Sequence, residues 1–393
     1  MAGKDKPYKV YRGGRSRGPV RLGGDRKDAR SSEKPAKDYD GRKADGAPKP
    51  KRRRRRWGRI VGLTITVLVL LAVVWLALGY LAVRRGVHAA NERLPQSAYR
   101  ALTPGEGSIL STPTNTLILG ADVGANFHGR EATGGRSDSI MLVRTDPDDH
   151  RLSYLSIPRD LRVEIPGHGA DKVNAAYALG GPALAIETVQ NLTGLPVNHV
   201  IVVDFATFKE VVDTVGGITI FNPTPILSKF ECPFKGAEAC SKFQGWRFKK
   251  GELHLDGRRA LIYSRVRKNS LNPGDSDITR GERQQRVIQA LMGKITGFSG
   301  FLHMPFWGDD IVKPLAMDLS TNELIQLTWV RKRASSSKTL KCHLGGTPSS
   351  IGGADVIESS EDNALVIAMI TGRSAPQRPP KGQIYAPGCF VGG

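Results

Sequence analysis

The sequence predicts an α/β fold: a three-layer α/β/α domain with a central mixed sheet, preceded by a disordered tail and one transmembrane helix. Three observations lead to this prediction. Residues 1–50 are rich in Gly, Lys, Arg, Asp and Pro and hold almost no aliphatic residues. Residues 60–83 hold no charged residue. Beyond residue 113, short β-branched or Leu-rich runs alternate with helical patterns, which is typical of a layered α/β domain.

Residues 1–56 form the predicted tail. They carry 21 Lys and Arg against 7 Asp and Glu, so most of the net charge of +21 belongs to this segment. Because so little apolar surface is available to offset the entropy of ordering, we expect disorder. The basic run 51–56 alone would allow nucleic-acid binding. Its position beside an apolar segment favours anionic lipid headgroups instead, and nucleic acid is not an expected partner.

A single transmembrane helix is predicted at residues 57–85. Its 24 uncharged residues, 60–83, would span about 36 Å as a helix, and a hydrocarbon core is about 30 Å thick. Trp57 and Tyr80 lie near the two ends, as interfacial aromatic residues do. The larger basic cluster precedes the segment. The positive-inside rule therefore places the tail in the cytoplasm and the rest of the chain outside the plasma membrane.

A polar connector, 86–113, leads to the predicted external domain at 114–372, and a Pro- and Gly-rich tail, 373–393, ends the chain. Within the domain, short runs rich in β-branched residues or Leu predict strands, and periodic apolar patterns predict helices. The expected strands are 115–119, 140–144, 152–157 and 197–203. The expected helices are 175–179, 182–192, 205–215, 256–264, 281–295, 321–330 and 360–371.

Residues 222–250 interrupt this alternation with Pro, Cys, Phe and Lys, and we interpret them as an insertion or long loop. All four cysteines lie in the part predicted to be outside the membrane, which suits two disulfides. Cys232 with Cys240 would close a short loop, and Cys342 with Cys389 would tie down the C-terminal end. Four unpaired thiols are the alternative. Metal binding is disfavoured, because neither pair has Cys-x-x-Cys spacing.

The segment 265–285 combines arginines, aspartates and a helix start. Thr279 followed by Glu282 predicts a capping box, which would place Arg280 and Arg283 in the first helical turn. One helical face would be polar at its beginning and apolar beyond, through Arg280, Arg283, Gln284, Val287 and Leu291. Cations are unfavourable at a helix N-terminus, so an anion is expected beside them. We interpret this segment as half of a phosphate site.

Charged residues also lie next to the other predicted strands. Ligands of open α/β sheets bind beyond the carboxyl ends of strands. Guanidinium groups bind phosphate oxygens, and two or three carboxylates can hold Mg²⁺ beside substrate phosphates. The set suits phosphoryl transfer on a diphosphate, although a single Arg–Asp pair is more often a surface ion pair worth about 0–1 kcal/mol. Its members are Asp122, Arg136, Asp138, Arg159, Lys172, Arg265, Arg267, Asp277, Arg280 and Arg283.

Seven motifs in this order resemble the LytR–CpsA–Psr (LCP) cell-wall ligases: NTLILGAD, GGRSDSIMLV, LSIPRD, KVNAAYALGGP, VVDFATFKEVVDTVGG, GELHLDGRRALIYSRVR and DITRGERQQRVI. The resemblance is detailed over residues 115–300. It implies an α/β/α fold outside the membrane that uses Mg²⁺ to transfer a glycopolymer from a polyprenyl-diphosphate carrier to peptidoglycan. It also implies an arginine-lined pyrophosphate pocket, with the lipid in an apolar tunnel.

Carried onto this chain motif by motif, the resemblance implies three groups of residues. Asp122 and Asp138 would bind the metal. Arg159, Asp277 and Arg280 would be catalytic, with Asp277 binding the metal or orienting the acceptor hydroxyl. The pyrophosphate pocket would be lined by Arg136, Arg159, Lys172, Arg265, Arg267, Arg280, Arg283 and Gln284, with Asn174 as a polar neighbour.

The chain departs from the family pattern around the predicted metal. Gly124 stands where the family often has Arg, Thr279 stands where Gly is usual, and the stretch from Asp122 to Asp138 is long. Arg130 is a candidate to replace the missing Arg. The alternative to an enzyme is a non-catalytic external module that binds polyprenyl diphosphate or an anionic polymer and has a regulatory tail. No motif encodes the polymer or the acceptor sugar.

Overall fold

The computed structural model describes residues 53–121, 135–272, 275, 277–380 and 382–392. Asp122, Gly124 and Arg130 lie outside this part of the chain, as does the predicted tail up to residue 52. Helix α1 (Arg53–Asn91) extends beyond both ends of the predicted transmembrane helix. Among the described helices, it is the one that is long and apolar enough to cross a membrane.

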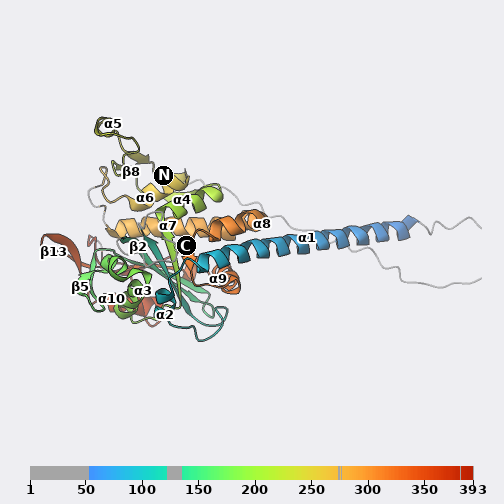
Figure 1. Ribbon diagram of the computed structural model, residues 1–393, viewed down its shortest axis with the longest axis horizontal. Helices are drawn as coiled ribbons and strands as arrows, with labels where there is room; N and C mark the ends of the chain where they lie inside the picture. The colour runs from blue at the N-terminus through green and yellow to red at the C-terminus, as the bar shows by residue number, and fades with distance from the viewer. Residues whose placement is uncertain (1–52, 122–134, 273–274, 276, 381, 393) are drawn as a thin grey trace, which may run out of the picture. The chain divides into compact units, whose positions relative to one another are not determined.

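A seven-stranded mixed sheet forms the centre of the domain (Figure 1). Its strands are β1 Thr114–Ala121, β2 Ser137–Asp146, β3 Arg151–Ile157, β6 His199–Asp204, β11 Ala316–Met317, β12 Leu340–His343 and β15 Gly388–Val391. They lie in the order β11-β6-β1-β2-β3-β12-β15. β2 is antiparallel to both β1 and β3, whereas β6 is parallel to β1 and β12 is parallel to β3. The predicted α/β class with a mixed sheet is confirmed.

Helices cover both faces of this sheet. Successive residues of each strand point to opposite sides, and apolar side chains on both sides need to be buried. Leu142 and Leu155 pack with Tyr177 of helix α3 (Val173–Thr193). Met141 and Tyr154, one position earlier on each strand, pack on the other face with Ile288 of helix α7 (Asp277–Thr296). Figure 1 shows α3 and α7 on opposite sides of β2. The predicted three-layer arrangement is therefore present.

Helix α3 joins two predicted helices, 175–179 and 182–192, across a kink. Gly180 and Gly181 have non-helical backbone angles, and Pro182 follows them directly. Gly181 has a φ of +62°, in the left-handed region that favours glycine. Residues from both halves are buried in the core beneath the sheet. The kink therefore keeps both halves in contact with the strands.

A second apolar core lies on the outer side of α7. It is built by helices α4 (Phe205–Thr214) and α6 (Gly257–Arg265) and by the antiparallel strands β7 (Ile218–Asn222) and β10 (Gly251–Leu255). Val287 of α7 packs in this core, so α7 lies between it and the sheet. Figure 1 shows α4 and α6 above α7. The predicted insertion holds β8 (Ile226–Ser228), α5 (Ala237–Ser241) and β9 (Trp246–Phe248).

A smaller four-stranded sheet has the order β13-β14-β4-β5. Its strands are β4 Leu161–Ile165, β5 Gly169–Lys172, β13 Gly346–Ile351 and β14 Ala354–Ser359. Further helices are α8 (Phe298–Val312), α9 (Thr321–Arg333), α10 (Asn363–Ile370) and a 3₁₀ turn at Ser336–Lys338. The sequence did not predict α8, because Gly300, Pro305 and Gly308 lie within it and lower its helix propensity.

Two predicted boundaries are wrong. The connector 86–113 is part of the domain. Helix α1 continues to Asn91, and helix α2 (Gln96–Ala101) follows. Leu94, between the two helices, and Ala98 of α2 are buried in the core. The C-terminal tail 373–393 contains β15, which forms the edge of the central sheet. Neither segment has a periodic apolar pattern from which its structure could be predicted. Contacts with residues far away in the sequence hold both segments in place.

Both predicted disulfides, Cys232–Cys240 and Cys342–Cys389, are present. Cys342 and Cys389 are paired residues of β12 and β15 and are buried in the core. This bond therefore holds the last strand on the sheet.

Replacing Cys389 by Ser should lower the free energy of unfolding more than replacing Cys232 by Ser. The two disulfides join cysteines 47 and 8 residues apart, and a longer closed loop removes more entropy from the unfolded chain. The loop contribution is about 4 kcal/mol for the longer loop and about 2.5 kcal/mol for the shorter one. Denaturant titration of the detergent-purified full chain measures both losses. A larger loss for Cys232→Ser would contradict this order.

Candidate functional site

The candidate site lies where the ends of β1, β3 and β6 are beside the start of β2. We refer to these four strand ends as one edge of the central sheet. Ala121, at the end of β1, is paired with Ser137 at the start of β2 and with Asp204 at the end of β6. Ile157, at the end of β3, is paired with Ile140 of β2. The residues that follow β3 and β6 therefore lie beside those at the start of β2. This is the type of sheet edge at which ligands bind in α/β folds.

The carboxylate of Asp138 is the centre of charge at this edge. Arg159 Nη1 lies 2.7 Å from Oδ1, Arg265 Nη2 lies 3.6 Å from Oδ2, and Arg267 Nη2 lies 3.7 Å from Oδ1. The side chains of Asp138 and Arg159 are 16% and 14% exposed, so salt screens this pair less than a surface pair. Arg159 and the pair Arg265 and Arg267, which come from two different sequence motifs, therefore converge on one carboxylate.

Asp160 and Lys172 extend this network. Arg159 Nε donates to Asp160 Oδ2 at 3.2 Å, and Lys172 Nζ donates to Asp160 Oδ1 at 3.0 Å. The backbone N–H of Asn174 donates to the carbonyl oxygen of Arg159 at 3.2 Å. These bonds hold Arg159 between two carboxylates and bring Lys172 to the same site. Asp160 was not among the predicted site residues.

Arg265, the last residue of α6, has aromatic and acidic neighbours. Its guanidinium carbon lies 3.9 Å from the ring centroid of Phe205 and 5.1 Å from that of Phe230. It also forms an ion pair with Glu231. These contacts fix the guanidinium where it reaches Asp138. The sequence did not single out Phe205, Phe230 or Glu231, because only the fold brings α4 and the insertion to the end of α6.

Tyr177 of α3 is another residue that the sequence did not single out. Its side chain is fully buried, and its hydroxyl has no hydrogen-bond partner among the described residues. Burial, and to a lesser degree the carboxylate of Asp204, raises the pKa of Tyr177. The phenol therefore stays protonated at neutral pH. It is an uncharged hydrogen-bond donor close enough to Asp204, at the end of β6, for that carboxylate to affect its pKa.

The start of α7 corrects one prediction. The helix begins at Asp277, two residues before Thr279, so the predicted capping box is wrong. The Thr279 hydroxyl donates to Asp275, and Glu282 pairs with Arg286 at 2.9 Å. The carboxylate of Asp275, just before the first turn, suits the positive end of the helix dipole. The side chain of Asp277 lies outside the described part of the chain.

Four polar residues of α7 are buried: Arg280 and Arg283 are each 4% exposed, Gln284 is 8% exposed and Gln285 is 3% exposed. Arg280 lies in the first turn and Arg283 in the second, instead of both in the first as predicted. Arg283 Nη1 donates to both oxygens of Asp275 at 2.8 and 3.0 Å, and Nη2 donates to the carbonyl oxygen of Val266. Arg283 therefore ties the loop before α7 to the end of α6.

Gln284 and Gly281 place α7 against the strands. Ser139 Oγ, next to Asp138 on β2, donates to Gln284 Oε1 at 3.0 Å. A Cβ on Gly281 would lie 2.5 Å from Ser156 Oγ of β3, so a larger residue there would force the Ser156 side chain or the helix to move. Both contacts bring the first turns of α7 to the edge that carries Asp138.

The predicted metal site is only partly described. Asp138 lies within the described residues, whereas Asp122 does not. Among the described residues, no group of three or more His, Cys, Asp or Glu could hold a metal ion. Asp138 still offers an oxygen donor, and Mg²⁺ is commonly held by one or two carboxylates together with substrate phosphates. Arg136, directly before β2, is exposed.

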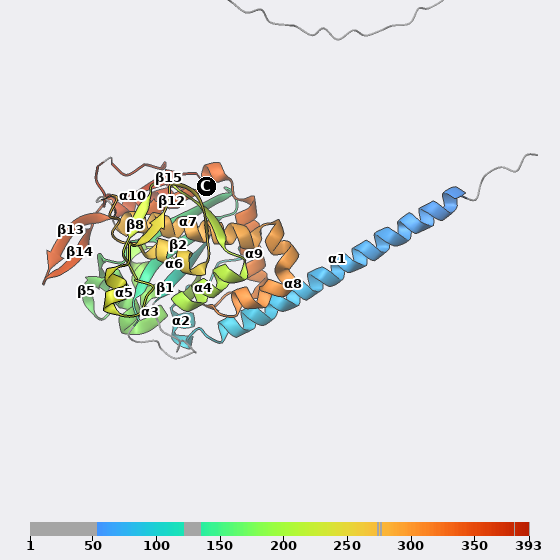
Figure 2. The same cartoon turned by 90° about the horizontal axis from the view of Figure 1, so that it is seen from above.

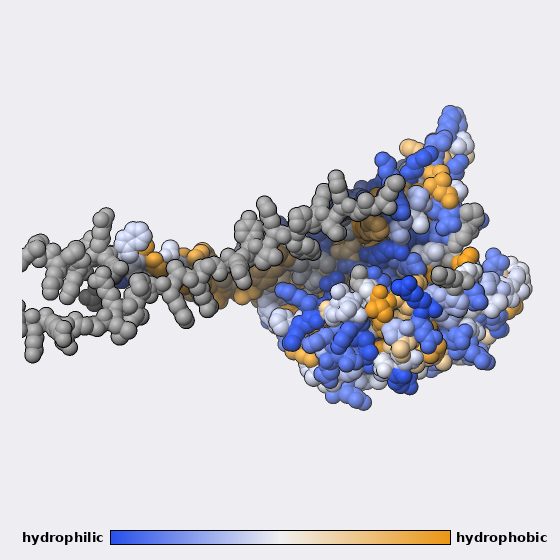
Figure 3. Space-filling model, turned by 180° about the vertical axis from the view of Figure 1, so that it is seen from behind, coloured by the Kyte–Doolittle hydropathy of each residue, from blue (hydrophilic) through white to orange (hydrophobic). Residues whose placement is uncertain are grey.

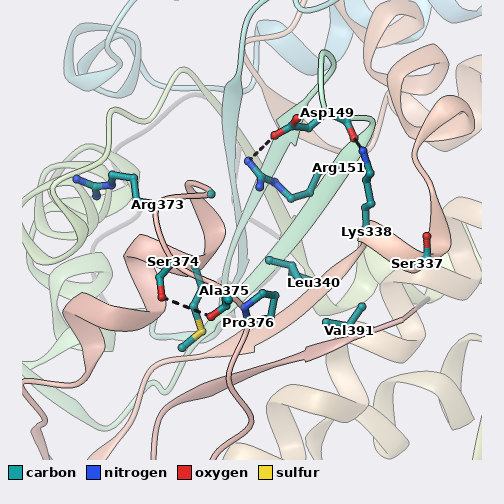
Figure 4. Close-up of a pocket in the computed structure, with 12 residues that line it drawn as sticks. Asp149, Arg151, Ser337, Lys338, Leu340, Arg373, Ser374, Ala375, Pro376 and Val391 are labelled. Atoms are coloured by element: carbon teal, nitrogen blue, oxygen red, sulfur yellow. Dashed lines mark hydrogen bonds and ion pairs between the residues drawn. The ribbon is translucent and has the colours of Figure 1, made fainter.

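A cavity of about 470 Å³ lies at the start of β3, the end opposite to the edge described above. Arg151, Lys338 and Arg373 line it. Arg151 is paired with Asp146 and lies 3.3 Å from Asp149, and Lys338 Nζ donates to the carbonyl oxygen of Asp149 at 3.0 Å. Figure 4 shows Arg373 apart from these two cations. Because these cations do not converge on one point, this cavity is not the candidate site.

Comparison with known proteins identifies the family. The model of the LytR_cpsA_psr family matches residues 90–370, which is more than half of the chain. The chain belongs to this family. The resemblance found in the sequence is thereby confirmed.

Among relatives in the LytR_cpsA_psr family, the polyisoprenyl-teichoic acid–peptidoglycan teichoic acid transferase TagV of Bacillus subtilis (strain 168) is 32% identical over 273 residues. The match covers 66% of this chain and 63% of TagV, so the chain spans less than two thirds of that relative. The crystal structure of B. subtilis TagV matches with a TM-score of 0.55 and 27% identity, over 67% of this chain and 97% of that one. The structure of YwtF (TagT) with bound octaprenyl pyrophosphate lipid matches with a TM-score of 0.50 and 25% identity, over 68% and 92% of the two chains.

Gly281→Ala should lower the melting temperature, because the new methyl group would overlap Ser156 Oγ and push α7 from β3. Overpacking of this kind costs about 1–3 kcal/mol. Adding Ser156→Ala removes the oxygen and should restore most of the loss. Gly293→Ala is the matched control in the same helix, since the nearest atom to its Cβ would be 3.8 Å away.

Thermal unfolding of the detergent-purified full chain measures these variants. If Gly281→Ala is as stable as Gly293→Ala, the close approach of α7 to β3 is not a constraint on this site.

Proposed function

We propose that the protein is a membrane-anchored extracellular phosphotransferase that transfers a glycopolymer from a polyprenyl-diphosphate carrier to peptidoglycan. The observation that carries this proposal is the convergence of Arg159, Arg265 and Arg267 on Asp138 at the ligand-binding edge of the sheet. Family membership and the name of the relative TagV support the chemistry. The apolar segment 60–83 of α1, preceded by the basic run 51–56, supports an anchor with the domain outside the plasma membrane.

The arrangement suits a diphosphate because its donors are held in place before a ligand arrives. Guanidinium groups match phosphate oxygens, and preorganised donors need no rearrangement during the reaction. Asp138 fixes Arg159, and Phe205 fixes Arg265. Arg267 has a side chain that is 44% exposed, so it is accessible to a ligand from solvent.

In the proposed reaction, a hydroxyl group of the peptidoglycan acceptor attacks the phosphorus next to the glycan. A phosphorus–oxygen bond forms to the acceptor, the bond to the bridging oxygen breaks, and polyprenyl phosphate leaves. Asp277, assigned from its motif, orients the hydroxyl and accepts its proton. Arg159 and Arg280 stabilise the negative charge that grows on the transferred and leaving phosphates.

Asp138 would hold Mg²⁺ together with oxygens of the diphosphate, and Asp122 is the second ligand proposed from its motif. When bound, Mg²⁺ would neutralise phosphate charge as a Lewis acid. The ion pairs of Asp138 keep its carboxylate at the edge of the sheet whether or not an ion is bound. Its side chain therefore has two proposed tasks, to position arginines and to bind the ion.

Arg159→Ala and Arg280→Ala should each lower the rate of transfer of a lipid-linked glycan to peptidoglycan in vitro by about 100-fold or more, as the loss of a preorganised donor does. Arg162→Ala is the control. Arg162 pairs with Glu358 at 3.6 Å and both side chains are more than a third exposed, so its loss should leave the rate near that of the unaltered protein.

Melting temperatures of the three variants show whether each still folds. Folded Arg159→Ala and Arg280→Ala proteins that keep full activity would refute the assignment. Binding of polyprenyl diphosphate by the unaltered protein without any turnover, with or without Mg²⁺, would instead support a non-catalytic binding module.

Chelation of divalent ions with EDTA should abolish transfer, and added Mg²⁺ should restore it, because the ion neutralises charge on the diphosphate. Binding of the lipid carrier should fall less, since the arginines remain. Transfer assays and equilibrium binding with and without EDTA measure the two effects. Transfer at an unchanged rate in EDTA would remove Mg²⁺ from the proposal.

A further inference from the structure

Helix α8 carries an exposed apolar stripe. Phe298, Phe301, Leu302 and Phe306 are 78%, 46%, 42% and 66% exposed. Their spacing of three or four residues places them on one side of the helix. From residue 297 to residue 308 the chain holds no Asp, Glu, Lys or Arg. Four large apolar side chains gathered on one helix face indicate a contact with something other than water.

Another side of α8 packs along α1. A Cβ on Gly79 would lie 2.4 Å from Met304 Cε, and a Cβ on Gly308 would lie 2.8 Å from Val83 Cγ2. Small residues allow two helices to approach this closely, as they do between membrane helices. Figures 1 and 2 both show α8 beside the domain end of α1. The two helices therefore pack directly against each other.

These contacts lie within the uncharged segment 60–83 of α1, whose apolar surface is visible in Figure 3. The ring of Trp75 meets that of Phe306 edge to face, with centroids 5.7 Å apart. Trp75 precedes Val83, the end of the segment, by about 12 Å of helix. Half of a hydrocarbon core measures about 15 Å. The contact with α8 therefore covers most of one leaflet.

Along this contact α8 runs in the same direction as α1. Gly79 meets Met304 and Val83 meets Gly308, which is four residues further along both helices. Phe298, at the start of α8, therefore lies at a greater depth in the segment than Gly308. The stripe begins at the deep end.

We propose that α8 is inserted in the leaflet on the domain side of the membrane, with its stripe against lipid acyl chains. The inference rests on the proposed crossing of the membrane by α1. If α1 crosses, α8 enters the same leaflet, because Met304 and Phe306 contact residues of the crossing segment. The end of α8 fits the headgroup region: a Cβ on Gly86 would lie 3.0 Å from the Asp309 carbonyl oxygen, and Gly86 follows the first charges after the segment.

Insertion of α8 gives the domain a second attachment beside α1. A single helix would leave the domain free to rotate and tilt, whereas two attached elements fix its orientation to the surface. The distance of the Asp138 edge from the membrane would then be fixed, which suits a phosphate carried on a membrane lipid.

The test uses the full chain in lipid nanodiscs with an environment-sensitive dye on single introduced cysteines. The four native cysteines form two disulfides and leave no free thiol to react. Phe298→Cys and Leu302→Cys report on the stripe. Leu78→Cys, 48% exposed on α1, is the lipid reference, and Phe221→Cys, 64% exposed on β7, is the aqueous reference. Doxyl lipids quench from the hydrocarbon, and iodide quenches from water.

We expect dyes at positions 298 and 302 to be quenched by doxyl lipids as strongly as the dye at 78, with iodide quenching constants several-fold below that at 221. Iodide quenching like that at 221, with lipid quenching at 78 intact, would overturn the insertion of α8 and leave the anchor standing. Protection from both quenchers would show that a second protein copy covers the stripe. Absence of lipid quenching at 78 would refute the anchor and, with it, this inference.

Discussion

The ion pairs of Asp138 are the interaction on which the rest of the site depends. Three guanidinium groups come from three segments: the loop after β3, the end of α6 and the loop before α7. Without a shared carboxylate, Arg159 and Arg265 would repel each other in a partly buried space. The negative charge of the carboxylate offsets this repulsion. It also holds the guanidinium groups at an edge of the sheet where phosphate oxygens can accept further hydrogen bonds from them.

The packing of α7 against the sheet holds its buried polar residues in fixed positions beside the ion pairs of Asp138. Gly281 lets the helix approach β3, and Gln284 bonds to Ser139 beside Asp138. Arg283 ties the loop before the helix to Val266 at the end of α6. α7 also separates the two apolar cores, so the sheet and the α4–α6 layer are both positioned through it.

The sequence predicted the fold class, four strands of the central sheet, both disulfides and the arginines that meet at Asp138, because each leaves a local pattern. It placed the helix start at Thr279, since Ser and Thr are common caps, whereas the helix begins at Asp277. It could not find Glu231 or Phe205 as partners of Arg265, because only the fold joins them. It also missed α8, whose glycines and proline obscure the helix and whose exposed phenylalanines suit lipid better than water.

A structure of the full chain with bound octaprenyl diphosphate tests the central claim most directly. The account predicts that both phosphorus atoms lie at the sheet edge, with phosphate oxygens within hydrogen-bond distance of Arg159, Arg265 and Arg267. A diphosphate in the cavity lined by Arg151 and Lys338, with the Asp138 edge occupied by solvent alone, would contradict it.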